Sequence, residues 1–150
     1  MHYASVKWIC FLLFVVVGKV AMAEGITSPD GNLRLEFTVN ALGEPVYQLF
    51  YKEKAVVNPS KLGLELVGDP GLMNGFTLVE AGASTFDETW KPVWGEVSQI
   101  RNHYNELAVT LDQKEQNRHI VIRFRLYDDG LGFRYEFPLQ RTLHYFTVKE

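Results

Sequence analysis

Four carboxylates lie within the stretch Phe86–Val109, and paired carboxylates are the groups with which many enzymes cleave glycosidic bonds. The four are Asp87, Glu88, Glu96 and Glu106. In such an enzyme two carboxyl groups face each other across the sugar, one as a proton donor and the other as nucleophile or base. Acidic residues are also common at the turns and strand edges of any acidic domain. The cluster therefore raises carboxylate chemistry as a hypothesis, and we assign no catalytic residue from it.

The same stretch is rich in side chains that bind sugars or other proteins. Trp90 and Trp94 offer flat apolar faces, and amide, imidazole and carboxylate groups follow them. Such a mixture suits a pyranose ring, which stacks through its C–H face and hydrogen-bonds through its hydroxyls. The candidate binding residues, for a sugar or for an interface, are Trp90, Trp94, Glu96, Asn102, His103, Asn105 and Glu106. An alternative is that the tryptophans, which flank Pro92, close the end of a β-sandwich core.

Other catalytic and metal-binding patterns do not occur in the sequence. Beyond the N-terminal segment the histidines are His103, His119 and His144, and none has another histidine two or four positions away. Zinc sites need three or four converging ligands, which this spacing does not provide. The chain also has no Gly-x-Ser-x-Gly, P-loop or Gly-x-Gly-x-x-Gly motif. We therefore predict neither a metal site nor acyl-transfer or nucleotide chemistry.

The N-terminal segment has the pattern of a secretory signal peptide. Lys7 precedes the apolar run Trp8–Val17, and Ala21-Met22-Ala23 supplies the small residues that signal peptidase accepts. A transmembrane anchor is the alternative, but the run is short for crossing a bilayer. We predict a signal peptide over residues 1–23, cleavage after Ala23, and a mature segment over residues 24–150 that is one domain or part of a larger one. The mature protein is then periplasmic or secreted, and no part of it is held in a membrane.

Signal cleavage changes the charge and the cysteine content. Without Lys7 and Lys19, 13 basic residues face 18 acidic ones, a net charge of −5. An acidic chain without a basic stripe is unsuited to nucleic acid or to anionic membrane surfaces. Cys10, the only cysteine, leaves with the signal peptide. The mature domain must therefore be stabilised by its core, without disulfides.

The hydrophobic pattern predicts an all-β protein. Apolar and polar residues alternate in most segments, and no run of ten residues has a helical period. Strands are expected at residues 33–39, 46–51, 55–57, 62–66, 76–81, 104–112, 119–127, 133–137 and 143–148. Short strands separated by Gly/Pro turns are typical of an antiparallel sandwich or barrel. The stretch that carries the four acids departs from this alternation and is expected to be rich in loops.

The last predicted hairpin can be assigned a register, because apolar faces must match across paired strands. Its first strand has an apolar face at Ile122, Phe124 and Leu126, and its second at Phe133, Tyr135 and Phe137. The predicted pairs are Leu126 with Phe133, Phe124 with Tyr135, and Ile122 with Phe137. Residues 128–131 then form the turn.

This register also pairs charged side chains on the opposite face. It places Arg123 opposite Glu136, which is favourable, and Arg125 opposite Arg134, which is unfavourable. Two adjacent arginines need an anion, from an aspartate of the turn or from a neighbouring domain. Otherwise they separate into solvent, which is the arrangement we expect.

Five segments in linear order resemble the N-terminal region of glycoside hydrolase family 97. They are SPDGNLRLEFTV, GEPVYQLFYKEKAVVNPSKLGLEL, FDETWKPVWGEVSQIRNHYNEL, IRFRLYDDGLGFRYEFPLQ and LHYFTVKE. The resemblance covers residues 24–150. It implies a periplasmic enzyme of polysaccharide utilisation, an α-glucosidase or α-galactosidase, either retaining or inverting. It also implies an N-terminal β-super-sandwich of the galactose-mutarotase type, followed by a (β/α)₈ catalytic barrel and a C-terminal β-sandwich.

The resemblance places the catalytic machinery outside this chain. In the family the barrel holds the catalytic carboxylates and most of the glutamates that bind a calcium ion. One further calcium ligand comes from the N-terminal domain, at a position we expect to lie beyond Glu150. We therefore carry over no catalytic or metal residue and expect no cofactor bound by this chain, with calcium in the complete enzyme. The expected partners are an α-linked oligosaccharide and a barrel encoded by the same or a split gene.

Three functions remain open from the sequence. The first is the N-terminal part of a family 97 glycosidase, inactive without its barrel. The second is a free-standing carbohydrate-binding module that uses Trp90 and Trp94. The third is a β-sandwich that docks onto a partner without affinity for sugar.

Overall fold

The computed structural model describes residues 23–149, and its regular structure consists of β-strands. The strands are β1 (Glu24–Thr27), β2 (Leu33–Val39), β3 (Pro45–Tyr51), β4 (Lys54–Lys61), β5 (Thr77–Trp90), β6 (Ile100–Gln113), β7 (Arg118–Leu126) and β8 (Leu131–Glu136). Two single-turn 3₁₀ helices, Lys114–Gln116 and Arg141–Leu143, are the only helical segments in this range. None of the helical segments described is long and apolar enough to cross a membrane. The predicted signal peptide falls almost entirely outside the described residues and stays a prediction.

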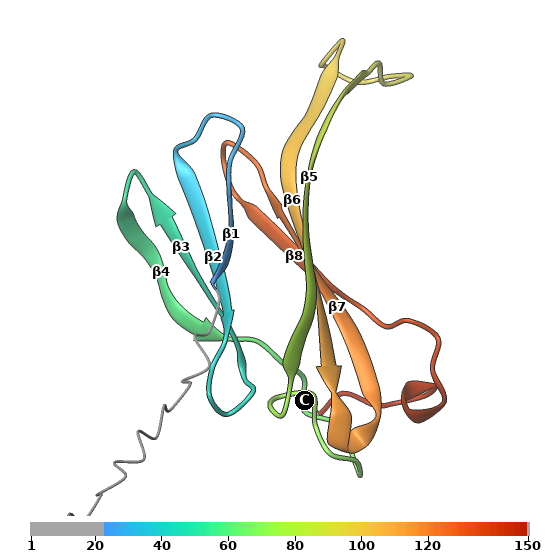
Figure 1. The fold of residues 1–150 in the computed structure, drawn as a ribbon. Helices are drawn as coiled ribbons and strands as arrows, with labels where there is room; N and C mark the ends of the chain where they lie inside the picture. The colour runs from blue at the N-terminus through green and yellow to red at the C-terminus, as the bar shows by residue number, and fades with distance from the viewer. Residues whose placement is uncertain (1–22, 150) are drawn as a thin grey trace, which may run out of the picture.

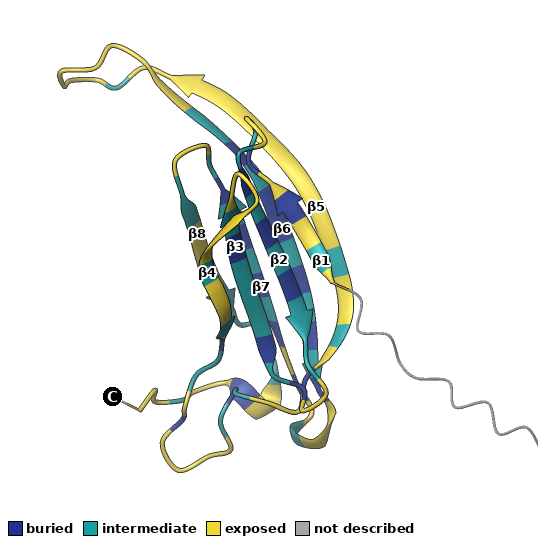
Figure 2. Ribbon diagram, turned by 90° about the vertical axis from the view of Figure 1, so that its left-hand side faces the viewer, coloured by how far each residue is buried: buried dark blue, intermediate teal, exposed yellow. Residues whose placement is uncertain are grey.

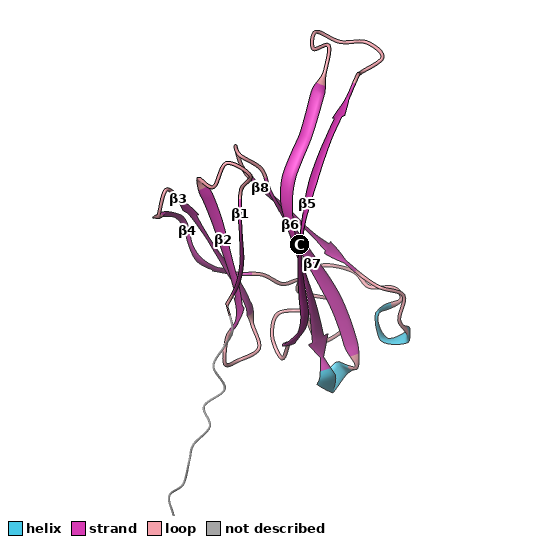
Figure 3. Cartoon of the chain, turned by 45° about the horizontal axis from the view of Figure 1, so that its top comes forward, coloured by secondary structure: helices cyan, strands magenta, loops and turns pink. Residues whose placement is uncertain are grey.

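The strands form two four-stranded antiparallel sheets that pack face to face (Figure 1). The first sheet has the order β1-β2-β3-β4 and the second the order β5-β6-β7-β8, so each strand pairs with its neighbour in sequence. Figure 3 shows the two short helical turns outside both sheets, one between β6 and β7 and the other in the segment after β8. The prediction of an all-β antiparallel sandwich is confirmed.

The core lies between the two sheets and follows the predicted alternation. Leu35 and Phe37 of the first sheet, and Val109, Ile122 and Phe124 of the second, are completely buried. The rings of Phe37 and Phe124 lie 5.7 Å apart across the sandwich. Figure 2 shows buried stretches in strands of both sheets, with β5 exposed along most of its length. Burial of these apolar faces is the main term that stabilises the fold.

Two predicted strands, at residues 62–66 and 143–148, are wrong. Leu62 and Leu66 are buried as their alternation implies, but the segment makes only isolated bridges, Leu64 to Leu72 and Leu66 to Val148. Gly63 has φ +152°, which turns the backbone out of a regular strand, and its N–H donates to the Tyr135 hydroxyl at 2.9 Å. Alternation predicts which residues are buried, whereas a strand also requires a partner in register.

The predicted register of the last hairpin is wrong by two residues. Phe124 pairs with Phe133, and Leu126 pairs with Leu131. The apolar faces still match, because a shift of two residues keeps every side chain on its face. The predicted turn would have left Leu131 in a loop, whereas the observed one packs Leu131 against the core. A tighter turn results, in which the N–H of Tyr127 donates to the carbonyl of Gly130 at 2.8 Å.

The expectation of a loop-rich segment in Phe86–Val109 is also wrong. β5 and β6 are both 14-residue strands, and their pairing extends from Thr77–Asp112 to Trp90–Ile100. Only residues 91–99 form a loop. Cross-strand pairs such as Thr85–Asn105 and Phe86–Tyr104 support the strands although apolar alternation along each is weak.

Candidate functional site

The β5–β6 hairpin extends beyond the rest of the sandwich. β7 pairs with β6 only as far as Asn105, whereas β5 continues to pair with β6 up to Ile100. Phe86–Trp90, Ile100–Tyr104 and the connecting loop 91–99 therefore form a two-stranded projection, which we call the arm (Figures 1 and 3). Five residue pairs at about 3.4 Å each give it a length of roughly 15 Å before the loop.

The two faces of the arm differ: one carries two apolar pairs with the polar pair Glu88–Asn102 between them, and the other carries charged and polar side chains. Directly paired residues share a face, so Phe86 with Tyr104 and Trp90 with Ile100 lie on one side. The rings of Phe86 and Tyr104 stack with centroids 5.2 Å apart. This side continues the outer face of the second sheet, which points away from the first sheet.

The opposite side of the arm carries an ion pair. Arg101 donates to the two carboxylate oxygens of Asp87 at 2.8 and 2.7 Å. His103 lies directly opposite Asp87 on the same side. The arginine lowers the pKa of Asp87 through this hydrogen bond, against a smaller desolvation effect. Asp87 is thus held ionised and engaged in bracing the arm.

The tip of the arm exposes a group of large apolar side chains. The exposed fractions are 49% for Trp90, 100% for Val93, 88% for Trp94 and 58% for Val97. These values exclude the alternative that the tryptophans close the core of this chain. Glu96 lies in the same loop and is exposed.

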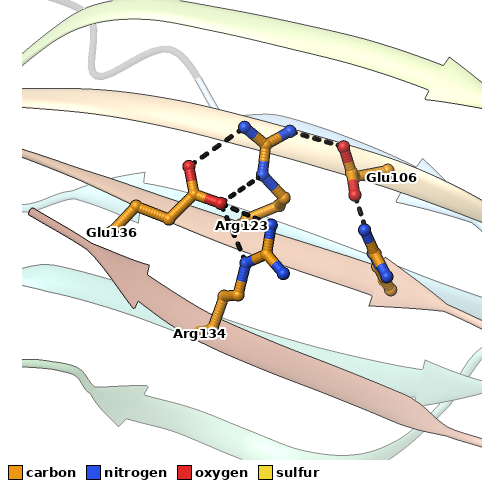
Figure 4. Close-up of polar contacts among 5 residues, drawn as sticks. Glu106, Arg123, Arg134 and Glu136 are labelled. Carbon is orange, nitrogen blue, oxygen red and sulfur yellow. Dashed lines mark hydrogen bonds and ion pairs between the residues drawn. The ribbon is translucent and has the colours of Figure 1, made fainter. Parts of the chain in front are cut away.

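An ionic network lies at the base of the arm, on the outer face of the second sheet (Figure 4). Glu106 is only 8% exposed and accepts from Arg123 at 2.5 Å and from Arg125 at 2.8 Å. Arg123 also donates to Glu136 at 2.8 Å, and Arg134 donates to the same carboxylate at 2.8 Å. The five groups therefore form one continuous chain across β6, β7 and β8.

This network corrects the predicted arrangement of the arginines. Arg134 lies opposite Arg123, not Arg125, and Glu136 lies opposite Val121. Arg123 and Glu136 still form an ion pair, because they are diagonal neighbours on one face. The arginines do not separate into solvent, since carboxylates of β6 and β8 lie between them.

Both carboxylates of the network are held ionised. Burial opposes ionisation of Glu106, but hydrogen bonds from Arg125 and Arg123 outweigh it and lower its pKa. The hydrogen bond from Arg123 is the main cause that lowers the pKa of Glu136 to about 2. A general acid needs a pKa near the working pH, so neither group suits that role in this state. Their chemistry here is to orient arginines.

Asn105 connects the two sheets. Its amide nitrogen donates to the carbonyl of Thr27 at 2.8 Å, and its oxygen accepts from Thr85 at 2.7 Å. It also lines a groove of about 580 Å³ between β1 and the middle of β5. Asn105 thus anchors the arm where it leaves the sandwich.

The structure distributes the seven predicted binding residues over three places. Trp90, Trp94 and Glu96 are at the tip of the arm. Asn102 and His103 lie on opposite faces of the arm, because they are consecutive in a strand. Asn105 and Glu106 are at the base, and Glu106 lies roughly 20 Å from the tip, six strand positions away. Among residues 23–149 no three His, Cys, Asp or Glu residues converge as metal ligands would.

Several residues of this region were not among the seven predicted binding residues, although the Arg123–Glu136 pair was expected from the sequence. Arg123, Arg134 and Glu136 belong to the network, and Phe86 and Ile100 belong to the aromatic side of the arm. The sequence contained one signal for the network. Arginines at alternate positions of β7 must share one face, and partly buried arginines are unfavourable unless carboxylates of the neighbouring strands pair with them. The missing information was the pairing of β6 with β7.

Comparison with known proteins finds similarity over nearly all of the residues that the structure describes. A family profile described as Glycosyl-hydrolase 97 N-terminal matches residues 26–150. A retaining alpha-galactosidase of Bacteroides thetaiotaomicron is 28% identical over 135 residues, covering 86% of this chain and 19% of that enzyme.

Solved structures share the fold. A glycoside hydrolase family 97 enzyme from a Pseudoalteromonas species, in complex with acarbose, has a TM-score of 0.78 and 30% identity. A second structure of a family 97 enzyme from that strain contains panose and gives the same values. A beta-arabinopyranosidase has a TM-score of 0.74 and 25% identity. This chain covers 83–84% of its own length in these matches but spans only about a fifth of each of those proteins.

Proposed function

The chain belongs to glycoside hydrolase family 97 through its N-terminal domain, and on this premise we propose that it serves as the N-terminal β-sandwich domain of an α-glycosidase. In the proposal the complete enzyme hydrolyses α-glucosides or α-galactosides, and this domain is inactive without the catalytic barrel. The observation that carries the proposal is the family match over residues 26–150, which includes the arm and all of the sandwich except the first two residues of β1. The barrel belongs to the same polypeptide or to a partner chain.

The substrate class follows from the relatives. Structures of family 97 enzymes contain acarbose and panose, and another relative is a retaining alpha-galactosidase. We therefore propose an α-linked oligosaccharide as substrate of the complete enzyme. The choice between glucoside and galactoside lies in barrel residues.

We propose that calcium binds to the complete enzyme and not to this domain alone. The acidic residues described here do not form a group that fits a calcium ion, which prefers six to eight oxygen ligands. Glu106 and Glu136 are neutralised by arginines, and Asp87 is neutralised by Arg101. We place the calcium ligands outside residues 23–149 and assign none of the steps of hydrolysis to a metal on this domain.

The proposed location is the periplasm or the cell exterior. It is supported by the signal-peptide pattern before Glu24 and by a mature domain without cysteine. N-terminal sequencing of the protein purified from the periplasmic fraction tests it, and a mature chain starting at Glu24 is the expected result.

Reconstitution tests the main proposal. The purified protein is mixed with the Pseudoalteromonas family 97 enzyme from which the segment matching this chain has been deleted. Hydrolysis of p-nitrophenyl α-glucoside and α-galactoside is then measured with calcium present. We expect the mixture to co-elute in size exclusion and to exceed the activity of either component alone. Two proteins that neither associate nor gain activity contradict the proposal.

A carbohydrate-binding module is the second candidate, supported by the 88% exposure of Trp94. An exposed indole is a stacking platform for a pyranose ring. Titration of the purified protein with panose and with galactosides, followed by tryptophan fluorescence, tests this candidate. A saturable change that disappears in Trp94→Ala supports it, and no change up to millimolar sugar removes it.

A further inference from the structure

We infer that the arm and the outer face of the second sheet below it form a docking surface for another protein domain. The surface of that partner domain is apolar where it contacts the tip of the arm and acidic where it contacts the base. This inference rests on the proposed function, because it takes the docked domain to be the catalytic domain. It adds which element makes the contact and what chemistry the partner surface carries. We call the surface from Trp94 down to Arg134 the docking face.

The tip is the first reason. A two-stranded ribbon outside a larger sheet is only marginally stable by itself. Here such a ribbon carries Trp90, Val93, Trp94 and Val97, all at least about half exposed. Large contiguous apolar surfaces on soluble proteins mark interaction sites. Burial against a partner removes this surface from water and orders the ribbon at the same time.

A protein surface fits the tip better than a sugar does. A bound sugar needs donors and acceptors around the stacking ring. Val93 and Val97, the exposed apolar neighbours of Trp94, provide none, so the polar groups of the loop are limited to Lys91, Glu96, Ser98 and Gln99. Asn102 and His103 are on opposite faces of the arm, so they do not both reach a ring stacked on the tip. Apolar side chains of a protein can cover Val93, Trp94 and Val97 without leaving a polar group unpaired on these three residues.

The base of the arm is the second reason, because it carries excess positive charge. Three arginines share two glutamates there, which leaves one positive charge on an otherwise acidic protein. The side chains of Arg134 and Arg125 are 59% and 34% exposed. A cavity of about 190 Å³ opens among Arg123, Arg125 and Arg134. A carboxylate of the partner accepts charge-assisted hydrogen bonds at such a site.

The two parts lie on one continuous, braced face. Tyr104 connects them: its ring stacks on Phe86 toward the tip, and the Arg125 guanidinium lies 4.5 Å from its centroid toward the base. Tyr127 packs on Tyr104 at 5.3 Å, and the Asp87–Arg101 pair braces the other side of the arm. Side chains that are already ordered lose little entropy on binding, which favours association. Aromatic residues and arginine are also the types enriched in protein interfaces.

Site-specific photo-crosslinking tests where the partner docks. Trp94→p-benzoylphenylalanine places the photoreactive group on the tip, and Leu139→p-benzoylphenylalanine is the matched control, since Leu139 is 89% exposed beyond the end of β8. Each variant is irradiated with the truncated Pseudoalteromonas enzyme described above. We expect a crosslink from position 94 and none from position 139. Co-elution with a crosslink from 139 alone overturns the inference and leaves the proposed function intact, whereas loss of co-elution overturns both.

Affinity measurements test the chemistry of the partner surface. We expect Trp94→Ala and Arg134→Glu each to weaken association with the truncated enzyme at least tenfold, and Leu139→Ala to leave it unchanged. Added salt should weaken the native complex more than the Arg134→Glu complex, because a charged contact is then already lost. An unchanged affinity in Arg134→Glu overturns the acidic part of the inference. A saturable fluorescence response to panose that is lost in Trp94→Ala shows a sugar site at the tip and overturns the apolar part.

Discussion

Glu106 is the residue on which the outer face of the second sheet depends. It is nearly buried, and its two carboxylate oxygens bind arginines from the neighbouring strand. One of these, Arg123, also binds Glu136 and so transmits the arrangement to β8. A carboxylate in this position stabilises the sheet by compensating charges that the strand register brings together.

The first prediction is that Glu106→Gln destabilises the protein by about 1–3 kcal/mol, because the partly buried side chains of Arg123 and Arg125 lose a charged acceptor. The free energy of unfolding is measured by urea denaturation at neutral pH. Glu88→Gln is the matched control, since Glu88 is exposed on the same face of the sheet. Equal and small effects for both substitutions contradict the structural role of Glu106.

The second prediction concerns acid. Arg123 lowers the pKa of Glu136 to about 2 from an ordinary value of 4.5. A carboxyl group with a lowered folded-state pKa contributes stability above its unfolded pKa and loses it as pH falls through the folded one. Stability measured by urea denaturation should therefore decline between about pH 5 and pH 2. Glu136→Gln should show a shallower decline over the same range, and an unchanged pH profile contradicts the assignment.

At the scale of elements, the arm is the part of the sandwich with the least support. β5 and β6 pair only with each other there, whereas the lower part of β6 is paired on both sides. Local opening needs less free energy where few apolar contacts are lost. The arm is therefore stabilised by the pairing of β5 with β6 and by the hydrogen bonds of Asn105, and not by packing in the core.

The third prediction follows from this difference. Amide hydrogens of the arm, in Glu88–Trp90 and Ile100–Asn102, should exchange with solvent faster than those of Leu107–Leu111. Asp87→Ala should accelerate exchange in the arm further, because it removes the Arg101 ion pair, and should leave the urea midpoint of the protein almost unchanged. Hydrogen-exchange mass spectrometry measures both. Equal protection along the whole of β6 contradicts the account.

For the whole molecule, the fourth prediction is that the purified protein alone does not hydrolyse p-nitrophenyl α- or β-glycosides, with or without calcium. Hydrolysis needs two opposed carboxyl groups on a rigid frame, one of them able to donate a proton. Asp87, Glu106 and Glu136 are each paired with arginine, and Glu88 and Glu96 are exposed. Calcium-dependent turnover that disappears in Glu96→Gln or Glu106→Gln contradicts this prediction.

The arm also determines where the domain exposes a group of large apolar side chains. The arm carries Trp90, Val93, Trp94 and Val97 to one end of the domain, and Figure 2 shows that end as exposed. The matched part of this chain is only about a fifth of each relative that shares the fold, so those proteins contain further domains. A domain with such a projection is suited to contact with a neighbouring domain.

The sequence by itself determined the all-β class, most strand positions and the composition of the core. Alternation along Leu33–Val39 and Arg118–Leu126 is a local property, and burial of one face of each strand follows from it directly. The family resemblance likewise depends on the linear order of motifs alone. These features need no knowledge of which strand lies beside which.

Only the tertiary structure decided the register of the last hairpin, the ionic network and the extent of the arm. A shift of two residues preserves every face, so alternation does not distinguish Phe124–Phe133 from Phe124–Tyr135, and packing of Leu131 decides between them. The Glu106–Arg125 contact depends on pairing between strands, which no local pattern specifies. Exposure of Trp94 is decided in the same way, because an aromatic residue is buried only where another part of the chain covers it.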